Sequence, residues 1–395
     1  MLLNVMNAQP ELRLFTPGPT NIPNRVAVAS SYVNYHHRSA SFSAIMKDLV
    51  VRMRPLFGTA EGLVMPVHTT GRGALEGVYA NLLAPGSKVI SICNGKFGEM
   101  SANIVKKLGL ECVRCFGDWK TDIDLDELEQ TVKKYGATAI TIPHNDTSNG
   151  IVNPVWGVGK LARKYGLLLI VDAVSSIGCM PFKFDEWGVD AVVTASQKGL
   201  MSPPGLSFVV LSGRAWKAAE ATESRASYIN FHAIKKELEN GQTPGSTPTS
   251  LVLAVNEGVN MILEEGLEQV YFRHSVVAQA TRRALLSLGY TFYAKCTCPS
   301  DSLTVMDMPS GLDSVQLIKH MRVKYGVQMS KGLDDEPQRT LRLAHMGYFK
   351  FTDLLDCIVA MEAALCDLGK ADKIGVGTTC FMESYNNAVA GSMKV

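Results

Sequence analysis

Short apolar runs alternate with helical or turn segments through the first half of this chain. Seven runs have the length and the composition of buried strands. They are GLVMPV, KVISIC, ECVRCF, TAITIP, LLLIVD, AVVTAS and SFVVLS. Strands that alternate with helices favour a largely parallel sheet with helices on both faces. We therefore expect an α/β fold.

A change of pattern near Pro248 predicts a second domain. Residues 249–288 form a nearly unbroken helical pattern that we expect to link two domains, and 395 residues are long for a single core. Beyond the link, the strand-like runs YTFYA, LTVMDM, GVQMSK and TLRLAH accompany helical segments at 314–325 and 352–368. This order predicts a compact α+β domain.

These patterns divide the chain into four parts. We place an N-terminal extension at residues 1–15, a large domain at 16–255, a small domain at 256–373 and a tail at 374–395. The tail is rich in Gly, Asn, Ser and Thr and shows no periodicity, so we expect it to be mobile.

The overall charge excludes several classes of partner. With 39 basic and 37 acidic residues the formal net charge is +2, so the chain has no basic footprint for nucleic acid or an anionic membrane. No apolar stretch approaches the ~20 residues that span a bilayer, and the first residues lack a signal-peptide pattern. We expect a cytoplasmic protein with a small-molecule partner.

The nine cysteines agree with that compartment, because they are scattered and odd in number. Cys112 and Cys115 form a CxxC, but no second pair follows at zinc-like spacing. The sequence therefore predicts neither a disulfide framework nor a metal site.

Lys198 lies in a turn of small residues, TASQKGLMSPPGL, directly after the run AVVTAS. A lysine there is suited to form an imine. Asp172 ends the run LLLIVD, 26 positions earlier, where open α/β sheets place groups that contact ligands. Together they indicate pyridoxal 5'-phosphate, with Lys198 as the Schiff-base lysine and Asp172 as the partner of the pyridine nitrogen. A lone lysine would more often be a solvated surface charge.

A phosphate site is predicted in HTTGRGALEG, residues 68–77, where a Gly-rich turn enters a helix. The amino end of that helix offers unpaired N–H groups and a favourable dipole, with Thr70 and Gly71 as the best contacts. An ordinary helix start would look similar. The GxGxxG fingerprint of dinucleotide sites is absent.

Two side chains could flank a pyridine ring. Phe97 follows a strand and a turn, which suits stacking on one face, and Val174 lies two positions beyond Asp172 and could press on the other. The alternative for Phe97 is a core position.

Polar residues follow the strand-like run TAITIP. Thr147 could bond the ring hydroxyl, with Asn145 or Asp146 nearby, although an Asx-type turn would also explain this segment.

Arg342 lies between Leu341 and Leu343 in a strand of the second domain. Because the leucines share one face, we expect Arg342 to point toward the domain cleft, where its planar fork could clamp a substrate carboxylate. A structural salt bridge is the alternative.

Five segments, taken in order, resemble the alanine–glyoxylate and serine–glyoxylate aminotransferase family, the class V branch of fold type I pyridoxal phosphate enzymes. They are FTPGPTNIP, HHRSASF, TTGRGALEG, VDAVSSIG and SQKGLMSPPGL, and the resemblance covers about residues 12–370. It implies a large domain with a mainly parallel seven-stranded sheet, a smaller α+β C-terminal domain and an obligate homodimer with shared sites.

The resemblance also implies roles for individual residues. Lys198 would carry the cofactor and Asp172 would pair with the pyridine nitrogen. The implied phosphate contacts are Gln197, Thr70 and Gly71, with Thr243 and Ser246 crossing the dimer interface; Phe97 stacks, Thr147 lies near a cofactor oxygen, and Arg342 with the Gly18 turn grips the substrate carboxylate.

Two positions depart from the family pattern. Arg72, which we count among the cofactor-binding candidates, stands where many members have a His or a small residue; it resembles the ureidoglycine–glyoxylate branch and could accept a further polar or anionic group on the substrate. Leu333 stands where pyridoxamine–pyruvate relatives carry a second arginine, which argues against that activity. His36 and His37 belong to the HHRS-type segment and are expected to order the amino-terminal loop.

We therefore expect a ping-pong transamination from alanine or serine to glyoxylate or pyruvate, in which Lys198 moves the proton from the substrate Cα to the cofactor C4'. One alternative is an (S)-ureidoglycine–glyoxylate aminotransferase. Another is a lyase or cysteine desulfurase of the same fold, although those relatives usually have a His directly before the lysine, where this chain has Gln197. A non-catalytic cofactor-binding protein is a third.

Overall fold

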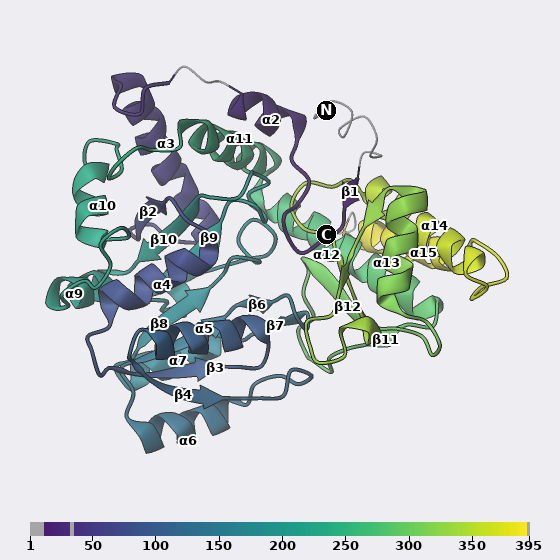
Figure 1. The fold of residues 1–395 in the computed structure, drawn as a ribbon, viewed down its shortest axis with the longest axis horizontal. Coiled ribbons are helices and arrows are strands. Elements are labelled where there is room, and N and C mark those ends of the chain that lie inside the picture. Colours follow the sequence, from purple (N-terminus) through teal and green to yellow (C-terminus); the bar gives the residue numbers. More distant parts are fainter. Residues whose placement is uncertain (1–11, 32–34, 393–395) are drawn as a thin grey trace.

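A seven-stranded sheet lies at the centre of the large domain in this computed structural model, which describes residues 12–31 and 35–392 (Figure 1). Its order is β2-β10-β9-β8-β5-β3-β4. The strands are β2 (Leu63–Val67), β3 (Lys88–Ile92), β4 (Glu111–Cys115), β5 (Ala139–Pro143), β8 (Leu168–Asp172), β9 (Ala191–Ala195) and β10 (Ser207–Leu211). Only β10 pairs antiparallel with its neighbours. All seven predicted runs are strands, and the mainly parallel sheet is confirmed.

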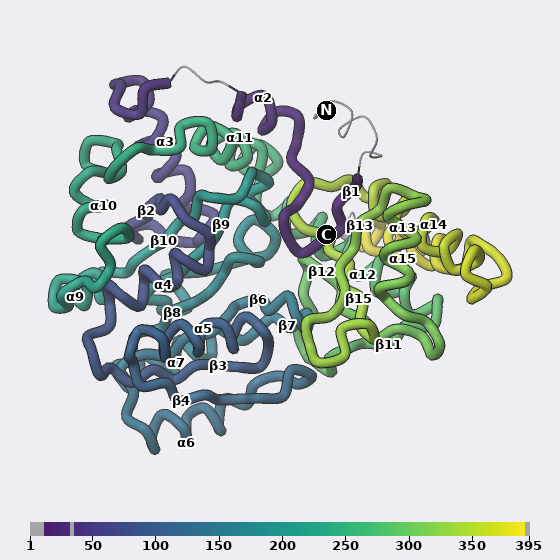
Figure 2. The backbone as a smooth tube through the Cα atoms, in the orientation of Figure 1, coloured from purple at the N-terminus to yellow at the C-terminus, as the bar shows by residue number. Residues whose placement is uncertain are grey.

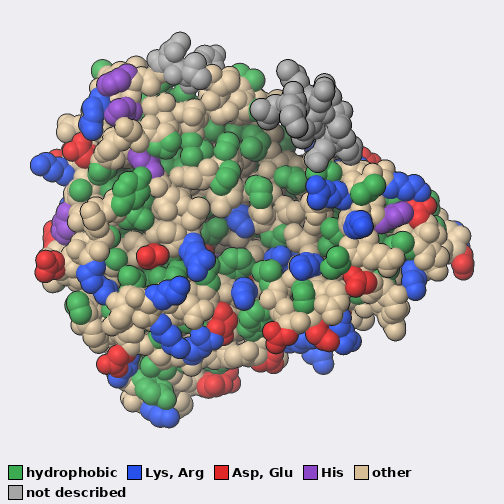
Figure 3. Space-filling model, in the orientation of Figure 1, with side chains coloured by type: hydrophobic (Ala, Val, Ile, Leu, Met, Phe, Trp, Pro, Cys, Tyr) green, Lys and Arg blue, Asp and Glu red, His purple; other side chains and the backbone are tan. Residues whose placement is uncertain are grey.

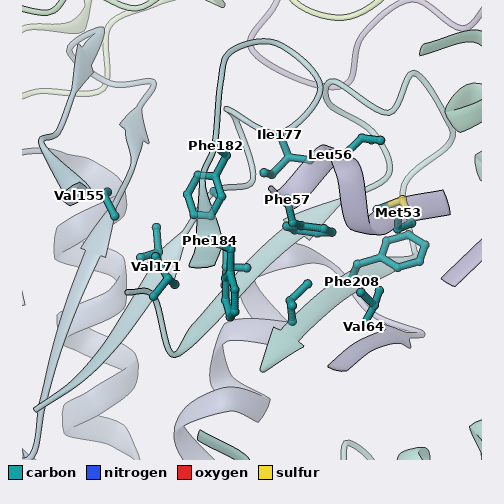
Figure 4. Close-up of a cluster of buried hydrophobic side chains, with 14 of the residues drawn as sticks. Met53, Leu56, Phe57, Val64, Val155, Val171, Ile177, Phe182, Phe184 and Phe208 are labelled. Carbon is teal, nitrogen blue, oxygen red and sulfur yellow. The ribbon is translucent and has the colours of Figure 1, made fainter. Parts of the chain in front are cut away.

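Helices cover both faces of this sheet, as the alternating pattern predicts. One face carries α3 (Ala40–Phe57), α6 (Leu125–Tyr135), α7 (Val155–Lys164) and α11 (Thr249–Glu265), and the other carries α4 (Gly71–Leu82), α5 (Lys96–Lys107), α9 (Gly213–Ala221) and α10 (Phe231–Leu238). Alternate strand positions enter opposite cores: Ile90 and Ile92 pack on the first face and Val89 on the second. Figure 4 shows part of the first core, where Phe57 and Phe208 lie near Val64.

Shorter elements connect these layers. They are α2 (Asn24–Ser30), α8 (Phe184–Trp187) and the small hairpin of β6 (Asn145–Asp146) with β7 (Ile151–Val152). The hairpin follows β5 directly, so it lies at the carboxyl edge of the sheet.

The predicted helical link is two helices, α11 and α12 (Leu267–Ser287), which are separated at Gly266. Gly266 has φ +85°, in the left-handed region that favours glycine, so the chain turns there. Gly258 stays inside α11, where a Cβ would overlap the carbonyl oxygen of Leu200.

The small domain is built on a second sheet of order β11-β12-β15-β14 (Figure 1). Its strands are β11 (Thr291–Phe292), β12 (Leu303–Asp307), β14 (Ser330–Lys331) and β15 (Thr340–Ala344), and its helices are α13 (Ser314–Tyr325), the short η1 (Pro337–Arg339) and α14 (Phe351–Asp367). This is the predicted α+β arrangement.

The described start of the chain joins the small domain rather than forming a separate extension. β1 (Arg13–Leu14) pairs in parallel with β13 (Val327–Gln328). From there the chain runs to α2, which packs on α11 of the large domain, as the purple segment in Figure 2 shows. Residues 1–11 of the expected extension lie outside the described residues.

The expectation of a mobile tail without regular structure is wrong for most of the segment. Val376–Ser392 form helix α15, which packs along α12 and buries Phe381 completely. The buried carboxylate of Glu362 on α14 accepts hydrogen bonds from the N–H groups of Gly375, Gly377 and Thr378 and from the Thr378 hydroxyl. These contacts satisfy the amino end of α15 from another element, which the tail's own sequence does not reveal.

None of the helices within the described residues combines the length and the apolar character that crossing a membrane requires.

Candidate active site

Lys198 lies in the turn that follows β9, beneath the amino-terminal loop. The Lys198 Nζ donates a hydrogen bond to the carbonyl of Pro17, and the Thr20 hydroxyl donates to the carbonyl of Lys198 at 3.1 Å. Gly18 has φ +141°, and a Cβ at this position would lie 2.6 Å from the Lys198 Nζ. Only glycine therefore lets this loop pass so close to the amine.

Asp172 is the last residue of β8, the strand beside β9, so it shares the carboxyl edge of the sheet with Lys198. Its Oδ1 accepts the N–H of Val174 at 3.0 Å. Burial raises the pKa of Asp172 to about 6 and lowers the pKa of Lys198 to about 8, and the attraction between the two groups partly offsets both shifts. Lys198 and Asp172, the predicted pair, therefore lie at one edge of the sheet, close enough for each charge to affect the pKa of the other.

Helix α4 points its amino end toward the same edge. A Cβ at Gly71 would lie 2.6 Å from Val174 Cγ2 and 3.5 Å from Ala195, so the first turn of α4 packs against the ends of β8 and β9. Thr70 is the N-cap residue, and its hydroxyl accepts the N–H of Gly73 at 3.4 Å. This turn contains no acidic residue, so none of its own carboxylates would compete with an anion at the amino end of the helix.

Thr147 and Arg342 meet across the domain boundary. Arg342 Nη1 donates to the carbonyl of Thr147 at 3.0 Å, and Arg342 Nε donates to the carbonyl of Lys331 at 2.7 Å. The arginine is 8% exposed and forms no ion pair with any described residue, so the salt-bridge alternative is wrong. Burial lowers the pKa of Arg342 to about 10, and the group stays cationic at neutral pH.

Phe97 is the second residue of α5 and is half-buried. Its backbone N–H donates to Asp146 Oδ2 at 2.9 Å. The residue is thus fixed to the turn that carries Thr147, and it is not among the fully buried core residues.

Three further predicted residues form no hydrogen bond with this group within the described chain. Thr243 is buried and shares its hydroxyl with His68 Nε2 at 3.0 Å and with the Thr247 hydroxyl at 2.7 Å, whereas Ser246 is exposed. Arg72, in the first turn of α4, is exposed as well.

The model of the family described as "Aminotransferase class-V" matches residues 14–334 of the chain. This chain is a class V aminotransferase. It is 35% identical over 367 residues to a serine–glyoxylate aminotransferase of Methylorubrum extorquens, covering 90% of this chain and 91% of that protein. An L-aspartate–glyoxylate aminotransferase of Paracoccus denitrificans is 30% identical over 387 residues, with 96% and 98% covered.

Solved structures show the same fold. A ureidoglycine–glyoxylate aminotransferase of Bacillus subtilis superposes with a TM-score of 0.90 at 24% identity, covering 96% of this chain and 99% of that one. An alanine–glyoxylate aminotransferase of a Nostoc species gives 0.86 at 27% identity, with 90% and 96% covered. The aminotransferase therefore has fold type I architecture and depends on pyridoxal phosphate.

The site of this aminotransferase fits that cofactor. An amine and a carboxylate attract one another at the carboxyl edge of the sheet, and the amino end of α4 packs beside them. Eight buried side-chain atoms lack a hydrogen-bond partner among the described residues, and two of them, the Thr147 hydroxyl and Gln197 Oε1, belong to predicted cofactor-binding residues. Buried polar atoms without partners are costly, so they indicate that a polar molecule completes this site.

Sequence reasoning missed the backbone of Pro17 and the hydroxyl of Thr20, which lie 181 and 178 positions from Lys198. The Pro- and Gly-rich motif FTPGPTNIP was visible, but which residue its carbonyls contact was not. His36 and His37 pack their rings 4.9 Å apart in the amino-terminal loop.

Proposed function

We propose that this aminotransferase moves an amino group from a small amino acid, alanine or serine, to a 2-oxo acid, glyoxylate or pyruvate. The observation that carries the proposal is the buried guanidinium of Arg342, which pairs with no carboxylate among the described residues and donates to the carbonyl of Thr147, another candidate site residue. Amino acids and 2-oxo acids both present a carboxylate that matches its fork. The serine– and aspartate–glyoxylate relatives support glyoxylate as acceptor.

Pyridoxal phosphate supplies an aldehyde and an electron-withdrawing ring when bound. Asp172 would hold the proton of the ring nitrogen. Lys198 Nζ would take the proton from the substrate Cα and return it in the opposite half-reaction, and its pKa of about 8 keeps part of the amine neutral and basic near pH 7. Arg342 would fix the substrate carboxylate while the Pro17–Thr20 loop covers the amine.

Further residues would hold the cofactor. Thr70, Gly71, Arg72 and Gln197 would bind the phosphate, Phe97 and Val174 would flank the ring, Thr147 would bond a cofactor oxygen, and Gly18 would help to bind the substrate. Support comes from the packing of Gly71 on Val174 and from the unpaired Thr147 hydroxyl.

We also propose a homodimer with shared sites, in which Thr243 and Ser246 of one subunit contact the phosphate of the other. Within the described chain Thr243 bonds to His68 and Thr247, and Ser246 is exposed. Val28 on α2 and Val51 on α3 are 59% and 56% exposed, and Figure 3 shows hydrophobic side chains gathered over α2 and α11. A second subunit would cover this apolar surface. We place the protein in the cytoplasm, which its nine free cysteines support.

A second candidate is ureidoglycine–glyoxylate aminotransfer. Arg72 favours it, because this exposed cation has no hydrogen-bond or ion-pair partner among the described residues. A polar substrate with an additional acceptor group could engage it.

Single-turnover mixing tests these proposals. The purified holoenzyme is mixed with alanine, serine, aspartate or ureidoglycine alone, and the absorbance of the pyridoxal form is followed as it converts to the pyridoxamine form. Conversion with alanine or serine, followed by recovery with glyoxylate or pyruvate, is the expected result. Conversion confined to ureidoglycine would favour the second candidate, and normal turnover by K198A would contradict the assignment of Lys198.

The dimer is tested by mixing two inactive variants, K198A and T243A/S246A. Shared sites predict recovered activity in the hybrid, because one of its two sites then has an intact set of residues. A monomer in analytical ultracentrifugation would contradict this part of the proposal.

A further inference from the structure

The first turn of α5, which carries Phe97, is capped by a segment from another part of the chain. Its N-cap residue is Gly95, which has no side chain to accept the free N–H groups. The Ser148 hydroxyl accepts the N–H of Lys96 at 2.9 Å, and Asp146 Oδ2 accepts the N–H groups of Phe97 at 2.9 Å and Gly98 at 3.3 Å. Three successive N–H groups are thus satisfied by the turn after β5.

Asp146 is completely buried and fully bonded. Its other oxygen, Oδ1, accepts the Ser148 N–H at 2.9 Å and the Ser148 hydroxyl at 2.6 Å. A Cβ on Gly95 would overlap this carboxylate, so the start of α5 and the turn fit together without room for a side chain at position 95. A buried carboxylate that accepts four hydrogen bonds holds its donors rigidly.

The same turn also reaches the other side of the site. The carbonyl of Thr147, the next residue, accepts a hydrogen bond from the Arg342 guanidinium. The Thr147 hydroxyl has no hydrogen-bond partner among the described residues. The charge of Asp146 acts on Arg342 by attraction and on Asp172 by repulsion. One short turn therefore connects Phe97, Arg342 and the Asp172 side of the site.

We propose that Asp146 is a positioning residue, which fixes Phe97 through the first turn of α5 and thereby sets the ring-facing wall of the site. The inference rests on the proposed function, because it assigns Phe97 to the cofactor ring. It differs from a purely structural role in one respect: most of the effect of Asp146 on cofactor affinity depends on Phe97.

The test is a double-mutant cycle with D146N and F97L in the full-length holoenzyme. Asn keeps the shape of the side chain but has no charge, so its oxygen is a weaker acceptor for the N–H groups of α5. Its NH₂ would also face the N–H and hydroxyl donors of Ser148, which loosens the turn. Because the cap then loses its charge-assisted hydrogen bonds, we expect the cofactor dissociation constant to rise about tenfold or more. If Asp146 acts through Phe97, the double variant will bind cofactor about as weakly as F97L alone.

Asp190 supplies a matched control. Asp190 is also buried. It precedes β9, at the end of the strand away from Lys198, and its carboxylate accepts the Leu169 N–H at 3.0 Å and the Ser212 hydroxyl at 2.8 Å. We expect D190N to lower the midpoint of unfolding without changing the cofactor dissociation constant, and to be additive with F97L. If D146N does not fold, S148A replaces it, because that change removes the acceptor of the Lys96 N–H and one donor to Asp146.

Amide hydrogen exchange of cofactor-free protein gives a readout that needs no turnover. We expect faster exchange at residues 96–98 in D146N than in wild type or D190N. The inference is overturned if D146N and F97L are additive in cofactor affinity, or if exchange at the start of α5 is unchanged. Absence of any half-reaction in wild type would instead refute the proposed function, and the exchange comparison would still decide the role of Asp146.

Discussion

Arg342 Nη1 lies 3.0 Å from the carbonyl oxygen of Thr147, and this hydrogen bond crosses from the small domain to the large one. The orientation of the guanidinium is therefore set by the relative placement of the two domains and by β14, which supplies the Lys331 carbonyl. A rigid fork held by two carbonyls is ready for a carboxylate before substrate arrives.

Replacing Arg342 should weaken substrate carboxylate binding. In R342Q we expect kcat/KM for alanine and for glyoxylate to fall about 30- to 160-fold, because a charge-assisted hydrogen-bonded pair contributes about 2–3 kcal/mol. R342K should fall less, since it keeps the charge but loses the fork. Steady-state kinetics with R339Q as control checks this, because Arg339 is exposed and its guanidinium pairs with Glu336 alone among the described residues. An equal loss of kcat/KM in R342Q and in the control R339Q would contradict the assignment of Arg342 to the substrate carboxylate.

The pKa of Lys198 predicts how cofactor capture depends on pH. A neutral amine is needed to attack the aldehyde, and with a pKa of about 8 in the cofactor-free protein about a tenth of the amine is neutral at pH 7. The rate at which visible absorbance develops after mixing cofactor-free protein with pyridoxal phosphate should rise from pH 6 to about 8 and then level off. A rate that keeps rising to pH 10 would show that burial does not lower this pKa.

Adding one methyl group at Gly18 should disturb the amine. In G18A the new Cβ would lie 2.6 Å from Lys198 Nζ at a backbone φ of +141° that alanine rarely adopts. We expect weaker cofactor binding, measured by absorbance titration, and a lower midpoint of thermal unfolding. G213A is the control, because a Cβ at Gly213 meets no atom within 4 Å. Unchanged cofactor affinity in G18A would mean that the loop moves away at little cost.

Glu362 should matter for stability and not for catalysis. In E362Q the buried carboxylate that holds the amino end of α15 becomes neutral and turns an NH₂ toward backbone donors. We expect the free energy of unfolding to fall by about 2 kcal/mol in urea denaturation, with KM values unchanged. E383Q, on the exposed side of α15, should leave stability nearly unchanged. An equal effect of both substitutions would show that the cap contributes nothing.

Most of the sheet, and the placement of several candidate site residues, could be predicted from the sequence because both depend on local patterns. Lys198 and Asp172 follow strands that run parallel, and parallel strands end at one edge, so their proximity could be expected. Arg342 alternates with two leucines that are fully buried, so its direction could be read from the period of a strand.

The parts that the sequence did not predict depend on distant partners. Helix α15 has no strong apolar stripe of its own and is held by Glu362 and by the burial of Phe381. The cap on α5 comes from Asp146, 49 positions beyond Phe97, so no local capping motif reveals it. The Pro17 carbonyl meets Lys198 from 181 positions away, and contacts of that kind follow only from the tertiary arrangement.

The path of the amino-terminal segment has a mechanical consequence. It begins as a strand hydrogen-bonded to the small domain, passes over the reactive amine at Pro17, and continues into α2 on the large domain. The small domain therefore cannot move away from the large domain without pulling on the Pro17 peptide that covers Lys198. Opening the site to substrate and freeing the Lys198 amine from the Pro17 carbonyl would thus occur in one movement.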